Sequence, residues 1–129
     1  MIQVNLFVGS HYPVNRRLIR ETINKVLADH RISQAQVDVS IVGVRKMRQL
    51  NASSLQHDGE TDVLSFPQHE RHRLDDVPLP PSVAPHLGDI VISFPAAVAA
   101  ARRYGKLVDT QIAFYLEHSL LHLLGFHHD

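Results

Sequence analysis

The chain has 129 residues and no cysteine, so disulfide bonds and thiolate metal ligands are both excluded. Any metal ion must therefore be held by histidine, carboxylate, backbone or water ligands. The sequence also lacks a segment long enough to span a membrane, and its N-terminus has no basic stretch ahead of an apolar run. These absences lead us to expect a cytoplasmic protein that makes no contact with membranes.

Net charge is absent as well, because 13 Lys and Arg residues balance 13 Asp and Glu residues. The molecule as a whole therefore has no strong field that would attract a polyanion such as RNA. Basic residues are nevertheless concentrated in one segment (Arg16, Arg17, Arg20, Lys25, Arg31, Arg45, Lys46 and Arg48). Solvated helix faces are the simplest interpretation of this segment, and a surface that follows a phosphate backbone is the alternative.

The remaining composition, 44% hydrophobic and 20% charged, is typical of one globular domain, which we place over residues 1–129. Alternating apolar residues or a continuous apolar run predict four strands, and apolar residues at helical spacing predict four helices. The predicted strands cover residues 2–8, 37–43, 62–66 and 88–93, and the predicted helices cover 15–29, 45–52, 96–104 and 109–124. Their order indicates an α/β (α+β) fold built on a single sheet.

Polar residues and breaks mark the ends of these elements. Asn15 and Asp109 are predicted to cap helices, and Gly125 is predicted to end the last helix. Four prolines predict a surface loop over residues 68–86. Asp89 follows a glycine, which is more typical of a turn residue than of a catalytic acid.

The last predicted helix carries two histidines four residues apart, His118 and His122. At this spacing the two imidazoles lie one above the other on the same face and can bind one metal ion. The apolar residues around them predict a helix that is buried nearly all round. A buried imidazole needs partners for both nitrogens, and a metal on one with a hydrogen bond on the other is a common arrangement.

Gly125 allows the chain to leave the helix and return, so that His128 can supply a third imidazole. Three neutral imidazoles suit one zinc ion per chain and leave a fourth position for water, whose pKa zinc lowers to about 7. The candidate metal ligands are thus His118, His122 and His128, which are also the candidate catalytic residues through the bound water. His127 competes with His128, because spacing alone does not separate adjacent residues. The alternative is that these are ordinary core or terminal histidines.

The histidines form an H-x3-H-x5-H pattern within the segment HSLLHLLGFHHD, and two further segments accompany it. Leu50 and Asn51 precede TDVLSFP at residues 61–67, and LGDIVIS occupies residues 87–93. In the order and spacing of all three segments, the chain resembles the YbeY family of bacterial endoribonucleases and rRNA maturation factors, which bind zinc through the three histidines. The resemblance covers most of the chain from about residue 47 onward.

The resemblance implies a mixed sheet of about four strands packed by helices, with a C-terminal metal-binding helix and the metal in a cleft beside the sheet. It also implies a zinc-dependent endoribonuclease specific for single-stranded RNA, which acts in maturation of the 3′ end of 16S rRNA and in ribosome quality control. The implied partners are the small ribosomal subunit, its rRNA and its assembly factors.

One position departs from the family pattern, because this chain has Leu55 where the family has an arginine between the LN and TDVLSFP segments. A guanidinium binds phosphate oxygens through two parallel hydrogen bonds. The arginines that could supply one instead are Arg45, Arg48, Arg71 and Arg73. In the TDVLSFP segment, Ser65 and Phe66 either line the cleft or are ordinary strand residues, and Asp62 can cap the start of the strand.

Two other functions stay open at this point. The chain could be a non-catalytic zinc-binding ribosome-assembly factor, as Leu55 allows, or a metal-dependent hydrolase of another substrate. Cleavage of RNA would indicate the endoribonuclease, and cleavage of other esters alone would indicate a different hydrolase. Cleavage of neither would indicate the assembly factor.

Overall fold

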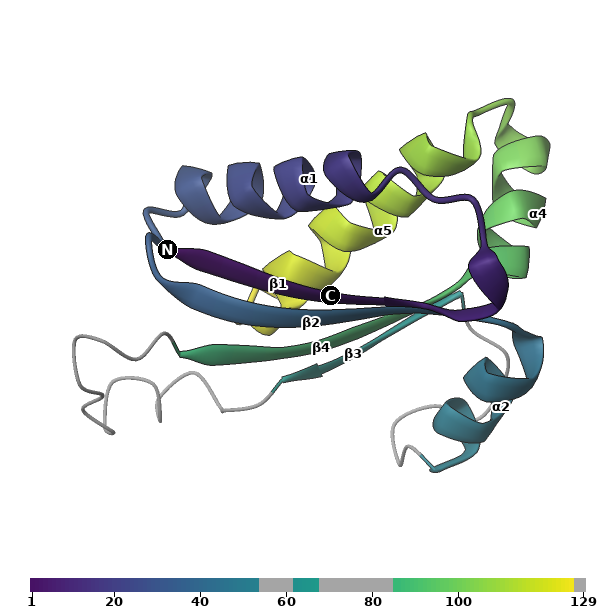
Figure 1. Ribbon diagram of the computed structural model, residues 1–129, viewed down its shortest axis with the longest axis horizontal. Coiled ribbons are helices and arrows are strands. Elements are labelled where there is room, and N and C mark those ends of the chain that lie inside the picture. The colour runs from purple at the N-terminus through teal and green to yellow at the C-terminus, as the bar shows by residue number, and fades with distance from the viewer. Residues whose placement is uncertain (54–61, 68–84, 127–129) are drawn as a thin grey trace.

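The computed structural model describes residues 1–53, 62–67 and 85–126, and its four strands form one sheet (Figure 1). The strands are β1 (Ile2–Val8), β2 (Ala35–Val42), β3 (Val63–Pro67) and β4 (His86–Ser93). In the spatial order β1-β2-β4-β3, β1 and β4 run parallel to β2, whereas β3 runs antiparallel to β4. The expected mixed sheet of four strands is confirmed, and β3 lies at one edge of it.

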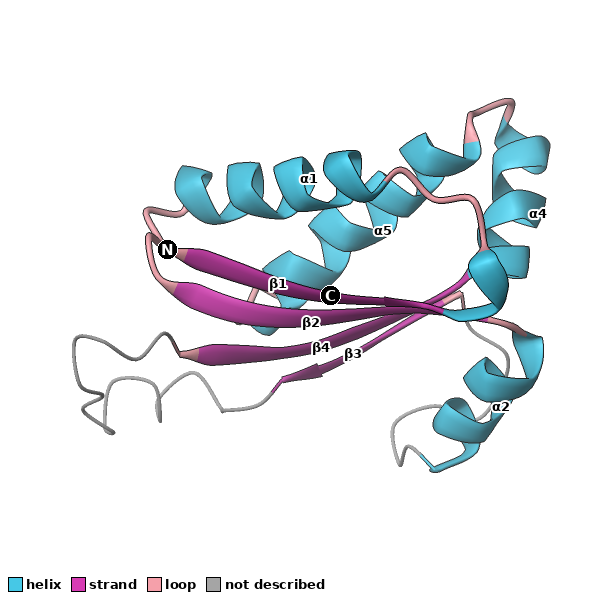
Figure 2. Ribbon diagram, in the orientation of Figure 1, coloured by secondary structure: helices cyan, strands magenta, loops and turns pink. Residues whose placement is uncertain are grey.

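Four helices and one short 3-10 turn accompany the sheet in the described part of the chain (Figure 2). They are η1 (Gly9–His11), α1 (Arg16–Asp29), α2 (Val44–Ser53), α4 (Phe94–Tyr104) and α5 (Val108–Leu123). Figure 1 shows α1 and α5 over one face of the sheet, whereas α2 lies on the opposite side at one end. The predicted order of strands and helices is confirmed.

The main core lies between the sheet and the helices α1 and α5. Every second residue of β2 is fully buried on this face, from Ala35 to Ile41, because strand side chains alternate between the two faces. A smaller apolar cluster covers part of the other face and consists of Met47, Leu64 and Val91. The sheet therefore has one fully covered face and one face that α2 covers only in part.

The predicted helix cap is confirmed at Asn15, and the one predicted at Asp109 is not observed. The side-chain oxygen of Asn15 accepts a hydrogen bond from the backbone N–H of Leu18 at 3.0 Å, as expected of an N-cap. The prediction for Asp109 is wrong, since α5 begins one residue earlier, at Val108. The Asp109 carboxylate instead accepts from the backbone N–H of Asn15 at 3.0 Å, which ties the start of α5 to the start of α1.

The start of β4 also differs from the prediction, because the strand begins at His86 and not at Gly88. His86 therefore lies within a strand, so its assignment to the loop is wrong. Asp89 lies inside the strand predicted over 88–93 and not in a turn. Pairing with β2 explains the difference, since Gln36 pairs with His86 and Asp38 pairs with Asp89. Such long-range pairing overrides the local proline and glycine signals.

Helix α5 buries one side only, so the expectation of burial all round is wrong. Ile112, Leu116 and Leu120 are at most 1% exposed, whereas Phe114 is 52% exposed and His118 is also exposed. Sequence periodicity cannot show how much of an apolar helix its neighbours cover. In the part of the chain that the structure describes, no helix has the length and apolar character needed to cross a membrane.

Candidate metal centre and adjoining cavity

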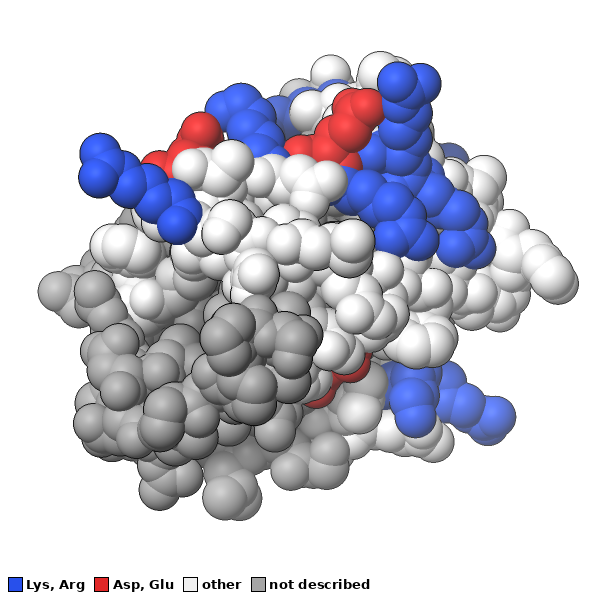
Figure 3. Space-filling view, turned by 60° about the vertical axis from the view of Figure 1, so that its left-hand side comes forward, with Lys and Arg blue, Asp and Glu red and all other residues white. Residues whose placement is uncertain are grey.

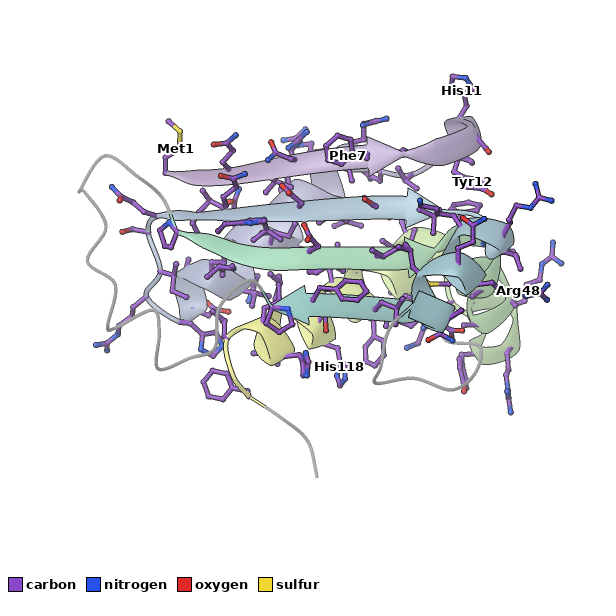
Figure 4. All side chains as sticks on the ribbon, turned by 90° about the horizontal axis from the view of Figure 1, so that it is seen from below. Met1, Phe7, His11, Tyr12, Arg48 and His118 are labelled. Carbon is purple, nitrogen blue, oxygen red and sulfur yellow. The ribbon has the colours of Figure 1, made fainter. Side chains whose placement is uncertain are left out.

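Two histidines of α5 project beside the edge strand β3. His118 is exposed and His122 is half-buried, and their spacing of four residues places them on the same face of the helix. Figure 4 shows His118 at the rim of the sheet next to β3. The pair is thus open to a ligand from solvent, while the opposite side of the helix is fixed in the core.

A hydroxyl group of β3 orients one of these rings. Ser65 Oγ lies 2.8 Å from Nδ1 of His122. When Nδ1 carries the proton, it donates to this hydroxyl, and Nε2 then has the lone pair that a metal ligand requires. Metal-binding histidines are commonly held in this way. Ser65 is therefore part of the candidate site, whereas Phe66 packs against the apolar cluster of α2 on the other face.

Tyr115, one helical turn before His118, anchors the residue that precedes β3. Its hydroxyl donates to Asp62 Oδ2 at 2.7 Å. Burial, and then this hydrogen bond, raise the pKa of Tyr115 to about 12, so the phenol remains a donor at neutral pH. The backbone N–H of Ser93 also donates to the carbonyl of Asp62 at 2.9 Å. Asp62 is thus held from two directions.

Gly125 ends α5 and redirects the chain, as predicted. Its φ of 95° lies in the region that favours glycine, and its N–H donates to the carbonyl of His122 at 3.0 Å. The N–H of Phe126 donates to the carbonyl of Leu121 at 2.9 Å, which completes a Schellman motif. His127 and His128 lie outside the described residues, so the choice of third ligand stays a prediction.

A cavity of about 180 Å³ lies between α2, the first turn of α4 and the residue before β3. The described residues that line it are Val44, Met47, Arg48, Asn51, Asp62, Ser93 and Ala96. Asn51 is only 6% exposed, and its side-chain oxygen has no hydrogen-bond partner in the described part of the chain. Buried polar atoms almost always have a partner, so this oxygen marks the cavity as a place for a ligand or water.

Two of the four candidate arginines can be located. Arg48 lines the cavity, and Arg45 is exposed one turn earlier on α2. Leu55, Arg71 and Arg73 lie outside the described residues. The basic segment does not form one surface, because α1 and α2 lie on opposite sides of the sheet. Figure 3 accordingly shows an upper group of Lys and Arg side chains, with acidic side chains among them, and a separate lower group.

The partly open face of the sheet carries a second group of possible metal ligands. Ligand atoms of Asp38, His86 and Asp89 lie within 4.8 Å of one another, and no other such group of three occurs among the described residues. His86 Nε2 is 3.3 Å from Asp38 Oδ2 and 3.7 Å from Asp89 Oδ1. Burial raises the pKa of Asp89, and the nearby Asp38 adds to this effect against the opposing charge of His86.

This group can accept a divalent cation or share a proton between its two carboxylates. Sequence reasoning missed it because its members come together only through the pairing of β2 with β4. The available signal was the alternation along β2, which places Asp38 on the face opposite the buried valines.

Fold and site together describe a small α+β protein with a histidine pair beside its edge strand. The endoribonuclease YbeY family matches residues 10–129. Among curated relatives, endoribonuclease YbeY of Dehalococcoides mccartyi is 36% identical over 118 residues, which cover 88% of this chain and 72% of the relative. Endoribonuclease YbeY of Moorella thermoacetica is 37% identical over 123 residues, which cover 92% of this chain and 78% of the relative.

A solved structure shows the same fold. The Thermotoga maritima protein TM1509, determined in solution, superimposes with a TM-score of 0.62 and 24% identity, over all of this chain and 75% of that protein. The family match, which extends through the histidine segment, and the curated relatives establish the relationship. The chain belongs to the YbeY family.

Proposed function

We propose that the chain is a metal-dependent endoribonuclease that cleaves single-stranded RNA, and that it acts in maturation of the 3′ end of 16S rRNA and in ribosome quality control. The observation that carries the proposal is the pair His118 and His122 beside β3, with Nδ1 of His122 on the hydroxyl of Ser65. It occurs in a chain whose curated relatives are named endoribonuclease YbeY.

We assign one zinc ion per chain to His118, His122 and His128. The donor set fits this ion, because imidazole nitrogens are preferred zinc ligands and three of them leave a position open for chemistry. When bound, zinc supplies the Lewis acidity that acidifies water and offsets negative charge on a phosphate. The chain itself orients His122 through Ser65 and places the positive charge of Arg48 at the adjoining cavity.

The histidine pair supports this role better than the Asp38, His86 and Asp89 group. That group lies on the opposite face of the sheet from α5, and its two neighbouring carboxylates can be stabilised by a shared proton. The histidine pair, in contrast, lies next to the TDVLSFP segment that the family shares. An rRNA substrate further implies the small ribosomal subunit and its assembly factors as partners, and a cytoplasmic location.

Elemental analysis of purified variants, combined with cleavage of an unstructured RNA with and without chelator, tests the proposal. We expect about one zinc per chain in the wild type and in the control variants His127→Ala and Asp89→Asn. His122→Ala and His128→Ala should lose both the metal and the cleavage, because two imidazoles alone make a poor site. Loss of the metal in Asp89→Asn alone would place it on the open face instead.

Cleavage must also depend on the metal. RNA cleavage that persists in His122→Ala or in chelator would come from a contaminating nuclease and would end the catalytic proposal. Binding to small ribosomal subunits with full zinc content but without cleavage would favour a non-catalytic assembly factor.

A further inference from the structure

The cavity beside α2 is lined by a residue with a polar atom that has no partner in the described part of the chain. Asn51 lines the cavity and is buried to more than nine-tenths, and its side-chain oxygen, itself buried, accepts no hydrogen bond from the described residues. An unsatisfied buried acceptor costs about 1–3 kcal/mol, so such a group is retained most easily where a ligand supplies the missing donor. The missing ligand therefore carries an N–H or O–H group.

The size and walls of the cavity restrict this ligand further. Its volume of about 180 Å³ corresponds to roughly six water molecules, which suits one small planar ring system. Val44, Met47 and Ala96 supply apolar walls, against which the faces of a ring can pack. Apolar contact with the ring faces and hydrogen bonds at the ring edge are how proteins hold an unstacked nucleobase.

The cavity also contains a second acceptor and a cation. Asp62 uses one carboxylate oxygen, Oδ2, for the hydroxyl of Tyr115, so its other oxygen remains able to accept a hydrogen bond. Arg48 adds a guanidinium, which can pair with a phosphate oxygen. Two acceptors and one cation at an apolar cavity match the edge of a base together with the phosphate attached to its nucleoside.

We propose that this cavity is a nucleobase-binding pocket of the endoribonuclease, and that it favours bases with an exocyclic amino group over uracil. An amino group can donate to the side-chain oxygens of Asn51 and Asp62, whereas uracil presents two carbonyl acceptors around a single N–H. The inference rests on the proposed function and adds a base preference to it.

The position of the pocket agrees with a role next to the metal centre. Asp62 lines the pocket, and three residues further along β3 the hydroxyl of Ser65 contacts His122, which corresponds to about 10 Å of extended strand. Tyr115 joins the same two regions, because it binds Asp62 and lies one helical turn before His118. An RNA strand that follows β3 can therefore have one base in the pocket and a phosphate at the histidines.

Binding of fluorescent hexamers of cytidylate and uridylate tests the base preference, because cytosine has an amino group beside an acceptor nitrogen where uracil has a carbonyl beside an N–H. Fluorescence anisotropy is measured on the protein as purified, at times too short for cleavage, and again in chelator. We expect the wild type to bind the cytidylate hexamer about three- to tenfold more tightly, as one or two hydrogen bonds predict. Asn51→Leu, which removes the acceptor but keeps the size, should bring this ratio close to one.

Two further variants protect the test from effects on folding. Asn24→Leu makes the same exchange on the exposed surface of α1, across the sheet, and should keep the wild-type ratio. Ala96→Leu fills the pocket without removing a polar group and should weaken binding of both hexamers while their ratio falls. Equal binding of the two hexamers by the wild type, or an unchanged binding ratio in Asn51→Leu, would overturn the proposed nucleobase pocket even if the protein cleaves RNA. Absence of both binding and cleavage of any RNA would overturn the proposed function and this inference with it.

Discussion

Asp89 is a single residue whose titration links the open face of the sheet to the stability of the protein. It lies in register with Asp38 on the neighbouring strand, and burial raises its pKa above the ordinary value of about 3.9. A raised pKa means that the folded state binds this proton more tightly than the unfolded state does. Protonated Asp89 therefore makes its full contribution to stability below the pKa of the unfolded state. This contribution is lost as the pH rises through the pKa of the folded state.

We accordingly expect Asp89→Asn to gain stability relative to the wild type as the pH rises from about 4 towards neutrality. The asparagine removes the charge that forms next to Asp38 but keeps the shape of the side chain. Urea unfolding of both proteins at a series of pH values measures the difference, which should grow and then level off. A difference that stays constant with pH would show that the folded protein does not hold this proton.

The histidine pair shows which residues the sequence can identify. His118 and His122 are neighbours along one helix, so their common face follows from spacing alone. Ser65 and Asn51 could be noticed only as members of shared segments, because their contacts with His122 and with the cavity depend on packing between distant elements. The alternation along β2 places Asp38 on the open face, but its closeness to Asp89 could not be predicted, since only strand pairing brings the two residues together.

At the scale of elements, the junction of β3, β4 and α5 depends on a glycine. Gly88 has a φ of 151°, and a Cβ atom on it would lie 2.4 Å from the carbonyl oxygen of Phe66 and 2.9 Å from a methyl group of Leu123. The first of these atoms belongs to the backbone of β3 and cannot move aside without shifting the strand. The absence of a side chain therefore allows β3 to lie close to β4 and to the last turn of α5.

Gly88→Ala should lower the free energy of unfolding by about 1–3 kcal/mol, which is typical of overpacking. Because β3 would shift relative to α5, the contact between Ser65 and His122 should also loosen, and zinc affinity should fall with stability. Gly105→Ala is a suitable control, since Gly105 also has a positive φ but has no atom within 4 Å of the added Cβ. Its cost should be limited to backbone strain of about 1 kcal/mol. Equal costs in urea unfolding would argue against the close packing at Gly88.

Most elements could be predicted because their periodicity is local. The strand β1 and the helix α1 begin and end close to the predicted residues, since alternation and a capping asparagine are read directly from neighbouring positions. The errors occur where long-range contacts decide the outcome. β4 is extended by pairing with β2, and Asp109 bonds to the start of α1 in place of its own helix.

At the scale of the whole molecule, the sheet separates two sets of basic side chains. α1 carries one set above the covered face, whereas α2 carries Arg45, Lys46 and Arg48 on the opposite side, where Arg48 lines the cavity. Two cations of α1 have acidic partners on the same helix: Arg17 pairs with Glu21 at 2.9 Å and Lys25 with Asp29 at 3.1 Å. With no net charge on the chain, attraction of RNA must come from such a local group and not from the overall field.

This distribution predicts how salt affects RNA binding. Each phosphate that a cation neutralises on single-stranded RNA contributes about −0.7 to the slope of log K against log salt concentration. Replacing Arg45 and Lys46 together by glutamine should therefore make the slope less steep by about 1.4. The matched pair Arg16→Gln and Lys25→Gln on α1 removes the same charge from the opposite face and should leave the slope unchanged.

Anisotropy titrations of one labelled hexamer at several salt concentrations measure both slopes. If the two pairs reduce the slope equally, RNA responds to total charge and not to the surface of α2. If only the pair on α1 changes the slope, RNA lies on the covered side of the sheet, away from the cavity. A change confined to the pair on α2 would place the RNA backbone on the side of the sheet where Asn51 and Asp62 line the cavity.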